Sequence, residues 1–170
     1  MKIALAGQMG SGKSSVAKEL EKRGFYLLNY KELIKEEVAK AMAAVGVRVT
    51  SEEALEKIHT DKEFYRPLLI AWADTTGWSD ASRLETFLKE LDKENIVLDN
   101  VRLLVQAEMV RVNGFIVIKL QGGNASDFLH EHDLDQFNFD AEIAWEDTVE
   151  QKVDKIIQVA TELMTHTSLQ

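Results

Sequence analysis

The sequence predicts an α/β fold: a three-layer, doubly wound parallel sheet of about five strands with helices on both faces. Short apolar runs alternate along the chain with segments whose apolar residues recur every three or four positions, which is typical of such sheets. With 170 residues, 45% of them hydrophobic, the chain is long enough to bury one core. We therefore expect one domain over residues 1–170.

The strands are expected at residues 2–6, 25–28, 95–99, 115–120 and, as a short fifth, 141–144. Helical spacing follows at 13–23, from Tyr30 to about 45, at 101–112 and from about 149 to 163. The stretch at about 30–92 between the second and third strands is a helical insert. Within it Thr50 and Glu53 have capping-box spacing, and Pro67 is expected to start or kink a helix.

The turn after the first strand carries the most specific pattern in the chain. Residues 7–14 read G-x-x-x-x-G-K-S, the phosphate-binding loop or Walker A motif, in its usual place between a strand and a helix. Glycines let the backbone approach a phosphate closely, and the helix adds its positive end. The residues expected to bind the nucleotide are Gly7, Gln8, Met9, Gly10, Ser11, Gly12, Lys13, Ser14 and Ser15.

The motif also assigns individual tasks. Lys13 would place a positive charge on the outer phosphates, and Ser14 would offer its hydroxyl to Mg²⁺. Asp99, which follows three apolar residues near a strand end, is expected to hold Mg²⁺ through water; otherwise it is a turn acid. The ligand is therefore expected to be ATP with Mg²⁺.

Two arginines are candidates for a second phosphate. Arg102 lies just after the third strand, and Arg66 lies in the helical insert. A guanidinium holds phosphate oxygens with two parallel hydrogen bonds, although most arginines are simply solvated. We predict that both bind the substrate phosphate.

Four further residues of the insert are weaker candidates. Tyr65, Trp72 and Trp78 are able to stack on a base, but aromatic residues at such spacing are more often core. Asp74 is a candidate for reading a base or sugar edge, with a solvated acid as the alternative. The run 130–133, His-Glu-His-Asp, lacks the spacing of a zinc site and is expected to be a solvated loop.

Composition narrows the function classes. The net charge of −9 argues against nucleic acid as a partner, and the absence of cysteine excludes disulfides and thiolate metal sites. Met1 leads directly into the first strand and no run is long enough to span a membrane, so we expect no signal peptide and no membrane contact. The protein is expected in the cytoplasm, that of the host if a phage encodes it, with small nucleotides as partners and a homodimer as an option.

With these residues in place, the chain resembles nucleoside monophosphate kinases, and most closely the phage-type deoxynucleoside monophosphate kinases within the P-loop NTPases. Residues 30–35 look like the aromatic-acid-Leu-Lys opening of that family's second helix, and residues 66–78 are similar to its R-x-x-L segment ending in Trp. Val101-Arg102 with Gln106-Ala107-Glu108 looks like its D-V-R-F-P-N-E-A-E stretch. The resemblance implies that Arg102 contacts substrate phosphate.

The chain also departs from that pattern. Asn100 stands where the family has Asp, and Val105 and Gln106 replace an Asn-Glu pair. The acidic, lid-like segment at about 121–139, and its continuation to 150, contains no Lys or Arg, whereas family lids usually carry arginines. An arginine from a second subunit would compensate, and Arg111 is the candidate.

The expected activity is transfer of the γ-phosphoryl group of ATP to a (deoxy)nucleoside monophosphate, a step of nucleotide metabolism. Lys13, Arg66 and Arg102 are the expected catalytic residues. Dephospho-coenzyme A kinase, which also tolerates a Leu-Leu pair after the acid, and other small-metabolite kinases are alternatives. The acidic segment without arginine also leaves open a nucleotide-binding regulatory module with weak turnover.

Overall fold

A computed structural model describes residues 1–46, 49–124 and 133–167. The chain divides into two compact units, Met1–Leu28 with Leu88–Gln170, and Asn29–Phe87. We call the first the sheet unit and the second the helical unit. Most of the insert expected at about 30–92 belongs to the helical unit.

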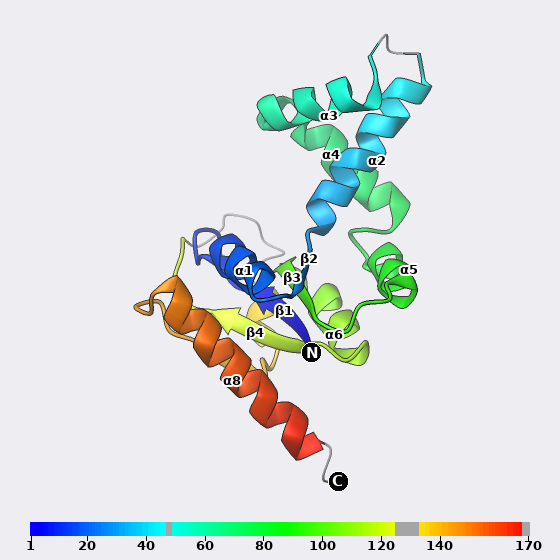
Figure 1. The fold of residues 1–170 in the computed structure, drawn as a ribbon. Coiled ribbons are helices and arrows are strands. Elements are labelled where there is room, and N and C mark those ends of the chain that lie inside the picture. The colour runs from blue at the N-terminus through cyan, green and yellow to red at the C-terminus, as the bar shows by residue number, and fades with distance from the viewer. Residues whose placement is uncertain (47–48, 125–132, 168–170) are drawn as a thin grey trace. The chain divides into compact units, whose positions relative to one another are not determined.

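The sheet unit contains five strands in the part of the chain that the structure describes. They are β1 (Lys2–Ala6), β2 (Tyr26–Leu28), β3 (Ile96–Val101), β4 (Ile116–Leu120) and β5 (Ala141–Ile143). Their order is β2-β3-β1-β4-β5, and every neighbouring pair is parallel. The expected α/β class with a five-stranded parallel sheet is confirmed (Figure 1).

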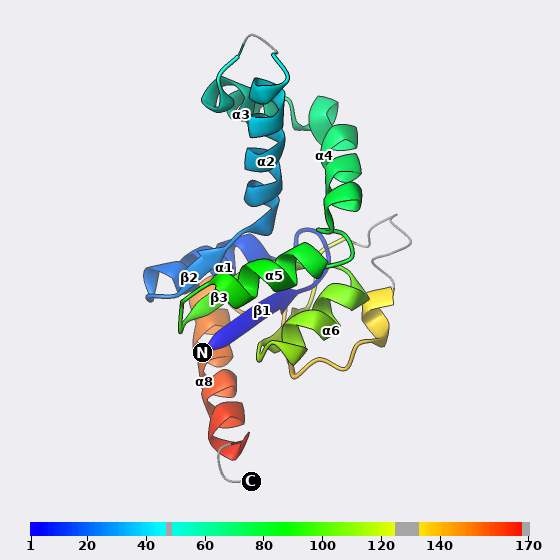
Figure 2. The same cartoon turned by 90° about the vertical axis from the view of Figure 1, so that its right-hand side faces the viewer.

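Both faces of the central strand are buried. Ile3 and Leu5 of β1 pack into one cluster with residues of α1 (Lys13–Lys22) and α8 (Val149–Thr167), while Ala4 and Ala6, pointing the other way, are also fully buried. In Figure 2, α6 (Leu104–Val112) lies on the face of the sheet away from α8. Apolar residues on both faces explain why the strands read as continuous hydrophobic runs.

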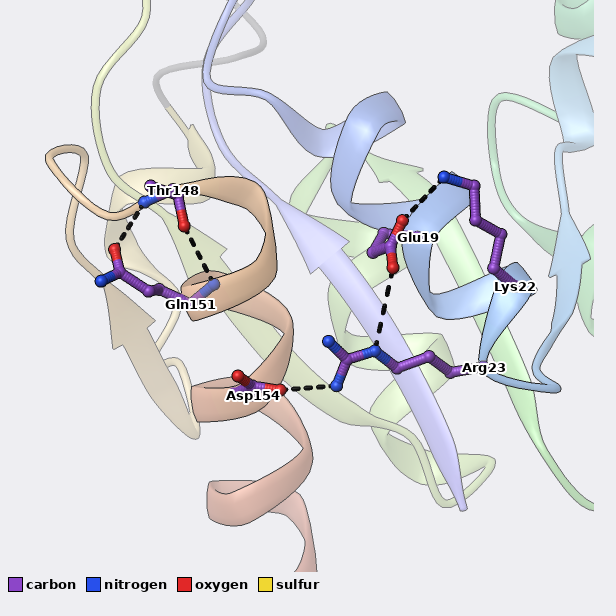
Figure 3. A network of polar contacts seen from close by, with 6 residues as sticks. All are labelled: Glu19, Lys22, Arg23, Thr148, Gln151 and Asp154. Carbon is purple, nitrogen blue, oxygen red and sulfur yellow. Dashed lines mark hydrogen bonds and ion pairs between the residues drawn. The ribbon is translucent and has the colours of Figure 1, made fainter.

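Polar contacts join the two helices that cover one face. The guanidinium of Arg23, just after α1, lies 2.5 Å from Asp154 of α8 and 3.9 Å from Glu19, which also accepts a hydrogen bond from Lys22 (Figure 3). All these side chains are at least partly exposed to solvent, and exposed ion pairs contribute little to stability. The buried apolar side chains therefore contribute most to the packing of α1 on α8.

The helical unit has its own small core. It contains α2 (Tyr30–Ala44), α3 (Ser51–Thr60) and α4 (Lys62–Thr76), and α5 (Ser82–Glu90) runs across its boundary. One cluster of buried residues in this unit consists of Val38, Ala39, Ala54 and Ile58. The predicted capping box of α3 is confirmed: Glu53 N–H donates to the Thr50 hydroxyl over 3.2 Å, and Thr50 N–H donates to Glu53 over 2.8 Å.

Of the two options for Pro67, starting or kinking a helix, the first does not occur. Pro67 lies inside α4, whose first turn is capped by the Asp61 carboxylate, which accepts a hydrogen bond from Phe64 N–H. The predicted end of the third strand needs correction, because Asp99 is not its last residue. β3 continues to Val101, which pairs with Ala6 beyond an irregularity in the β1–β3 ladder.

The structure contains no helix, within its described residues, that is both long enough and apolar enough to cross a membrane.

Candidate functional site

The turn between β1 and α1 has the backbone that its glycines predict. Gly7, Gly10 and Gly12 have φ of 139°, 80° and 91°, a region that side chains with a Cβ rarely adopt. A Cβ on Gly7 would lie 2.5 Å from the Leu120 carbonyl oxygen and 2.9 Å from the Ser11 hydroxyl. Glycine at position 7 is thus required by space as well as by φ.

Lys13 folds back over this turn. Its Nζ donates to the carbonyl oxygens of Gly7 and Gln8, each over 2.6 Å, and to the Ser11 hydroxyl over 3.3 Å. The side chain is 7% exposed, so the ammonium is held at the centre of the turn. The turn therefore encloses a fixed positive charge.

The N-terminus of α1 opens onto the same turn. Gly12 occupies the N-cap, and within the described residues no side chain caps this end and no acidic residue lies in the first turn. Ser14 and Ser15 are exposed. The first N–H groups of α1 and its positive end are thus available to an anion, which is the arrangement that binds phosphate.

A second segment of glycines supports the turn, and no short pattern in the sequence predicts this contact. Asn124 N–H donates to the Met9 carbonyl oxygen over 2.8 Å, forming an isolated antiparallel bridge. Gly123 has φ of 91°, and a Cβ there would collide with the Met9 carbonyl. The start of the lid-like segment therefore holds the loop in shape.

Asp99 lies in β3 near the end of the sheet from which the loop leaves. It is 6% exposed, and its strand neighbours Leu98 and Val101 pair with Ala4 and Ala6, the residues that lead into the loop. A hydroxyl and a carboxylate, Ser14 and Asp99, are hard oxygen donors of the kind that Mg²⁺ prefers. No cluster of three or more His, Cys, Asp or Glu exists among the described residues.

Arg102 is oriented by Asn100, the residue that departs from the family pattern. The Arg102 Nε donates to Asn100 Oδ1 over 2.9 Å, and Asn100 is 3% exposed. Gln106, the other departure, accepts from Arg102 N–H over 3.2 Å and Leu103 N–H over 3.3 Å at the start of α6. At each of these two positions the chain has an amide oxygen in place of the family's carboxylate. An oxygen that accepts a hydrogen bond is thus kept at both, and this is the feature of the sequence that indicates their roles.

Arg66, the second predicted phosphate ligand, lies on α4 in the helical unit. Its Nη1 is 3.4 Å from Glu63 one turn earlier, and both side chains are well exposed. An exposed pair of this length is worth a few tenths of a kcal/mol at most.

The two predicted tryptophans share one acceptor in the helical unit. Trp72 Nε1 and Trp78 Nε1 donate to Glu37 Oε2 over 2.9 Å and 3.1 Å. The other oxygen of Glu37 accepts from Arg83 Nε over 2.9 Å and from Arg83 Nη2. Burial raises the pKa of Glu37, but these hydrogen bonds and the Arg83 charge outweigh it and hold the pKa below its ordinary value.

This cluster changes the interpretation of the aromatic residues. Trp78 is only 2% exposed and its ring is stacked on Tyr30 at 6.2 Å, which argues against the predicted contact with a base. Trp72 and Tyr65 are partly buried against the core of the helical unit. Asp74 is exposed and accepts a hydrogen bond from the Ser79 hydroxyl over 2.5 Å. For Trp78 the structure therefore favours the alternative interpretation, in which the residue packs inside the helical unit.

Arg111 is engaged within its own chain. Its guanidinium lies 3.1 Å from Asp140 Oδ1, donates to the Asn138 carbonyl and sits 4.0 Å from the centroid of the Phe137 ring. These contacts argue against the prediction that Arg111 reaches the active site of a second subunit. Residues 130–132 of the run 130–133 lie outside the described residues, as do residues 125–129 of the lid-like segment.

No family model matches the chain, and no curated protein is significantly similar to it.

Proposed function

We propose that this protein is a P-loop NTPase with a three-layer, doubly wound sheet, and that it transfers the γ-phosphoryl group of ATP to a (deoxy)nucleoside monophosphate. The observation that carries the proposal is the turn of residues 7–14, where three glycines in the left-handed region, the enclosed Lys13 ammonium and the open end of α1 coincide. Each of these features favours an anion with several phosphates.

The chain's own residues would perform three tasks. The backbone N–H groups of the loop bind the phosphates, and Lys13 stabilises the charge that develops as the γ-phosphoryl group leaves. Ser14 and Asp99 would hold Mg²⁺, which would neutralise part of the phosphate charge. Arg102, oriented by Asn100, would bind the phosphate of the acceptor monophosphate, and Arg66 is the other candidate for this task.

No general base is needed for this reaction. The acceptor phosphate is already a nucleophile at neutral pH, so positioning and electrostatic stabilisation supply most of the acceleration. The hydrogen bond from Arg102 to the buried Asn100 is consistent with such a positioning role.

The test is consumption of ATP with Mg²⁺ in the presence of each ribo- and deoxynucleoside monophosphate in turn. We expect one or a few monophosphates to become diphosphates, and Lys13→Ala to reduce the rate roughly 100-fold or more. Lys18→Ala, which removes the same charge from an exposed position of α1, is the matched control and is expected to leave the rate unchanged. Equal activity of both variants would contradict the proposal.

One observation favours a second candidate. Residues 121–150 contain no Lys or Arg, although charge on the transferring group must be neutralised. A regulatory module would bind ATP without transferring phosphate to any acceptor. The acceptor panel should therefore include dephospho-coenzyme A, so that a small-metabolite kinase is distinguished from a module without turnover.

A further inference from the structure

Lys152, in the first turn of α8, is a buried cation beside the phosphate loop. The residue is 6% exposed, and its Nζ lies 4.0 Å from the point where a Cβ on Gly12 would stand. The ammonium lies over the ring of Trp145, and its Nζ is 5.0 Å from the ring centroid. Within the residues that the structure describes, no hydrogen bond or ion pair of this ammonium is found.

The surroundings of Lys152 are unfavourable for a cation on its own. Burying an ammonium is costly unless it is paired. Gly12 marks the N-terminus of α1 and Lys152 itself lies at the N-terminus of α8, so the ammonium stands near two positive helix ends. The contact with Trp145 offsets only part of this cost. An anion bound at Gly12 would make this position favourable for the ammonium, because it would pair with the positive charge.

Several contacts fix Lys152 in this place. Thr148 and Gln151 form reciprocal hydrogen bonds of 2.9 Å and 3.2 Å that define the start of α8 (Figure 3). The Lys152 N–H donates to the Thr148 carbonyl oxygen over 2.9 Å. Trp145 packs so closely on Gly122 that any Cβ there would overlap its ring. The ammonium is therefore held by the backbone of α8 and by the indole.

We propose that Lys152 binds the phosphates of the nucleotide, as a second cation at the loop opposite Lys13. This inference rests on the proposed function and deepens it, because it names a source of positive charge for a site whose neighbouring segment, 121–150, has none. Trp145 is a positioning residue that keeps the ammonium in place until the phosphates arrive.

The experiment is calorimetric titration of the full chain with inorganic tripolyphosphate, with ATP and with adenosine, in the presence of Mg²⁺. Lys152→Met keeps the buried aliphatic stem and removes the charge. It should weaken binding of tripolyphosphate and ATP about 10-fold or more, the effect of losing one charged hydrogen bond. Binding of adenosine should not change.

Matched variants separate charge from structure. Lys155→Met removes the same charge one turn later, from a half-exposed side chain paired with Asp147, and should leave all three affinities unchanged. Lys152→Arg should retain most of the affinity for tripolyphosphate. Trp145→Leu should weaken tripolyphosphate binding less than Lys152→Met, because it loosens the ammonium without removing it.

The outcomes also distinguish the two proposals. If Lys152→Met binds tripolyphosphate as the wild type does, and only its melting temperature changes, the inference is overturned while the kinase proposal stands. If the wild type binds neither ATP nor tripolyphosphate, both fail. If the wild type binds ATP and Lys152→Met loses affinity, but no acceptor is phosphorylated, the inference stands and the transfer reaction fails.

Discussion

The Arg102 Nε donates a 2.9 Å hydrogen bond to Asn100 Oδ1, and the two residues are separated by only one position at the end of β3. Asn100→Ala would remove this acceptor from the guanidinium. We expect the KM for the acceptor monophosphate to rise several-fold while the KM for ATP changes little. Steady-state kinetics with each substrate varied in turn would measure the difference.

A double-mutant cycle makes this prediction specific. Arg102→Ala and the double variant with Asn100→Ala should have nearly the same KM, since Asn100 acts through Arg102. Asn100→Asp keeps the oxygen acceptor and should behave like the wild type. Additive effects of the two alanine substitutions would show that Asn100 has a separate role.

Gly7 and Gly114 test whether the phosphate loop needs glycine for space or only for φ. Both have positive φ, 139° and 80°. A Cβ on Gly7 would meet the Leu120 carbonyl oxygen at 2.5 Å, whereas none of the described residues comes within 4 Å of a Cβ on Gly114, its chain neighbours aside. Gly114→Ala should cost about 1–2 kcal/mol, the backbone strain alone. Gly7→Ala should cost more and should also weaken ATP binding. Urea unfolding and ATP titration of both variants would check this, and equal losses would be inconsistent with the collision.

Asp99 provides a test of the metal site. Asp99→Asn has the same shape but lacks the charge that would attract Mg²⁺, so the Mg²⁺ concentration for half-maximal turnover should rise about 10-fold or more. Removal of Mg²⁺ with a chelator should abolish turnover in the wild type. Asp92→Asn, at an exposed position of the same unit, serves as the control. An unchanged Mg²⁺ requirement in Asp99→Asn would exclude this carboxylate from the metal site.

The sequence predicted those features that depend on neighbouring residues. The apolar runs that form the strands, the glycines of residues 7–12 and the capping pair Thr50 and Glu53 are all local patterns, and the structure has each of them. The Asp61 cap that begins α4, five residues before Pro67, is a local signal of the same kind.

The contacts that were missed join residues far apart in the chain. Gly123 fits against Met9, and Glu37 accepts from Trp72, Trp78 and Arg83, which lie 35, 41 and 46 positions later. Which residues these side chains contact depends on how whole helices and loops pack. No short sequence pattern indicates that packing. The sequence indicates the two tryptophans as candidates, but it does not indicate the acid that accepts hydrogen bonds from both indole N–H groups.

Glu37 gives a prediction of how stability depends on pH. Because its pKa in the folded state is held below the ordinary value of about 4.3, its stabilising effect is complete above that pH. The effect is lost as the pH falls through the folded-state pKa, since protonation removes the pairing with Arg83. Glu37→Gln should therefore lower the free energy of unfolding by about 1–3 kcal/mol at pH 7, and by less once the pH falls through the folded-state pKa.

Urea unfolding at several pH values, followed by tryptophan fluorescence, would measure this difference. Two other acids of the helical unit also lose stabilisation in acid: Glu32, whose pKa is raised by burial but lowered more by Lys35 and His59, and Asp80, whose pKa is lowered by hydrogen bonds from Ser82. Their contribution is common to wild type and variant and cancels in the comparison. Glu36→Gln, at the exposed neighbouring position, should follow the wild-type curve at every pH. A gap between wild type and Glu37→Gln that stays constant from pH 7 to pH 3 would mean that the shape of Glu37, and not its charge, holds the two tryptophans.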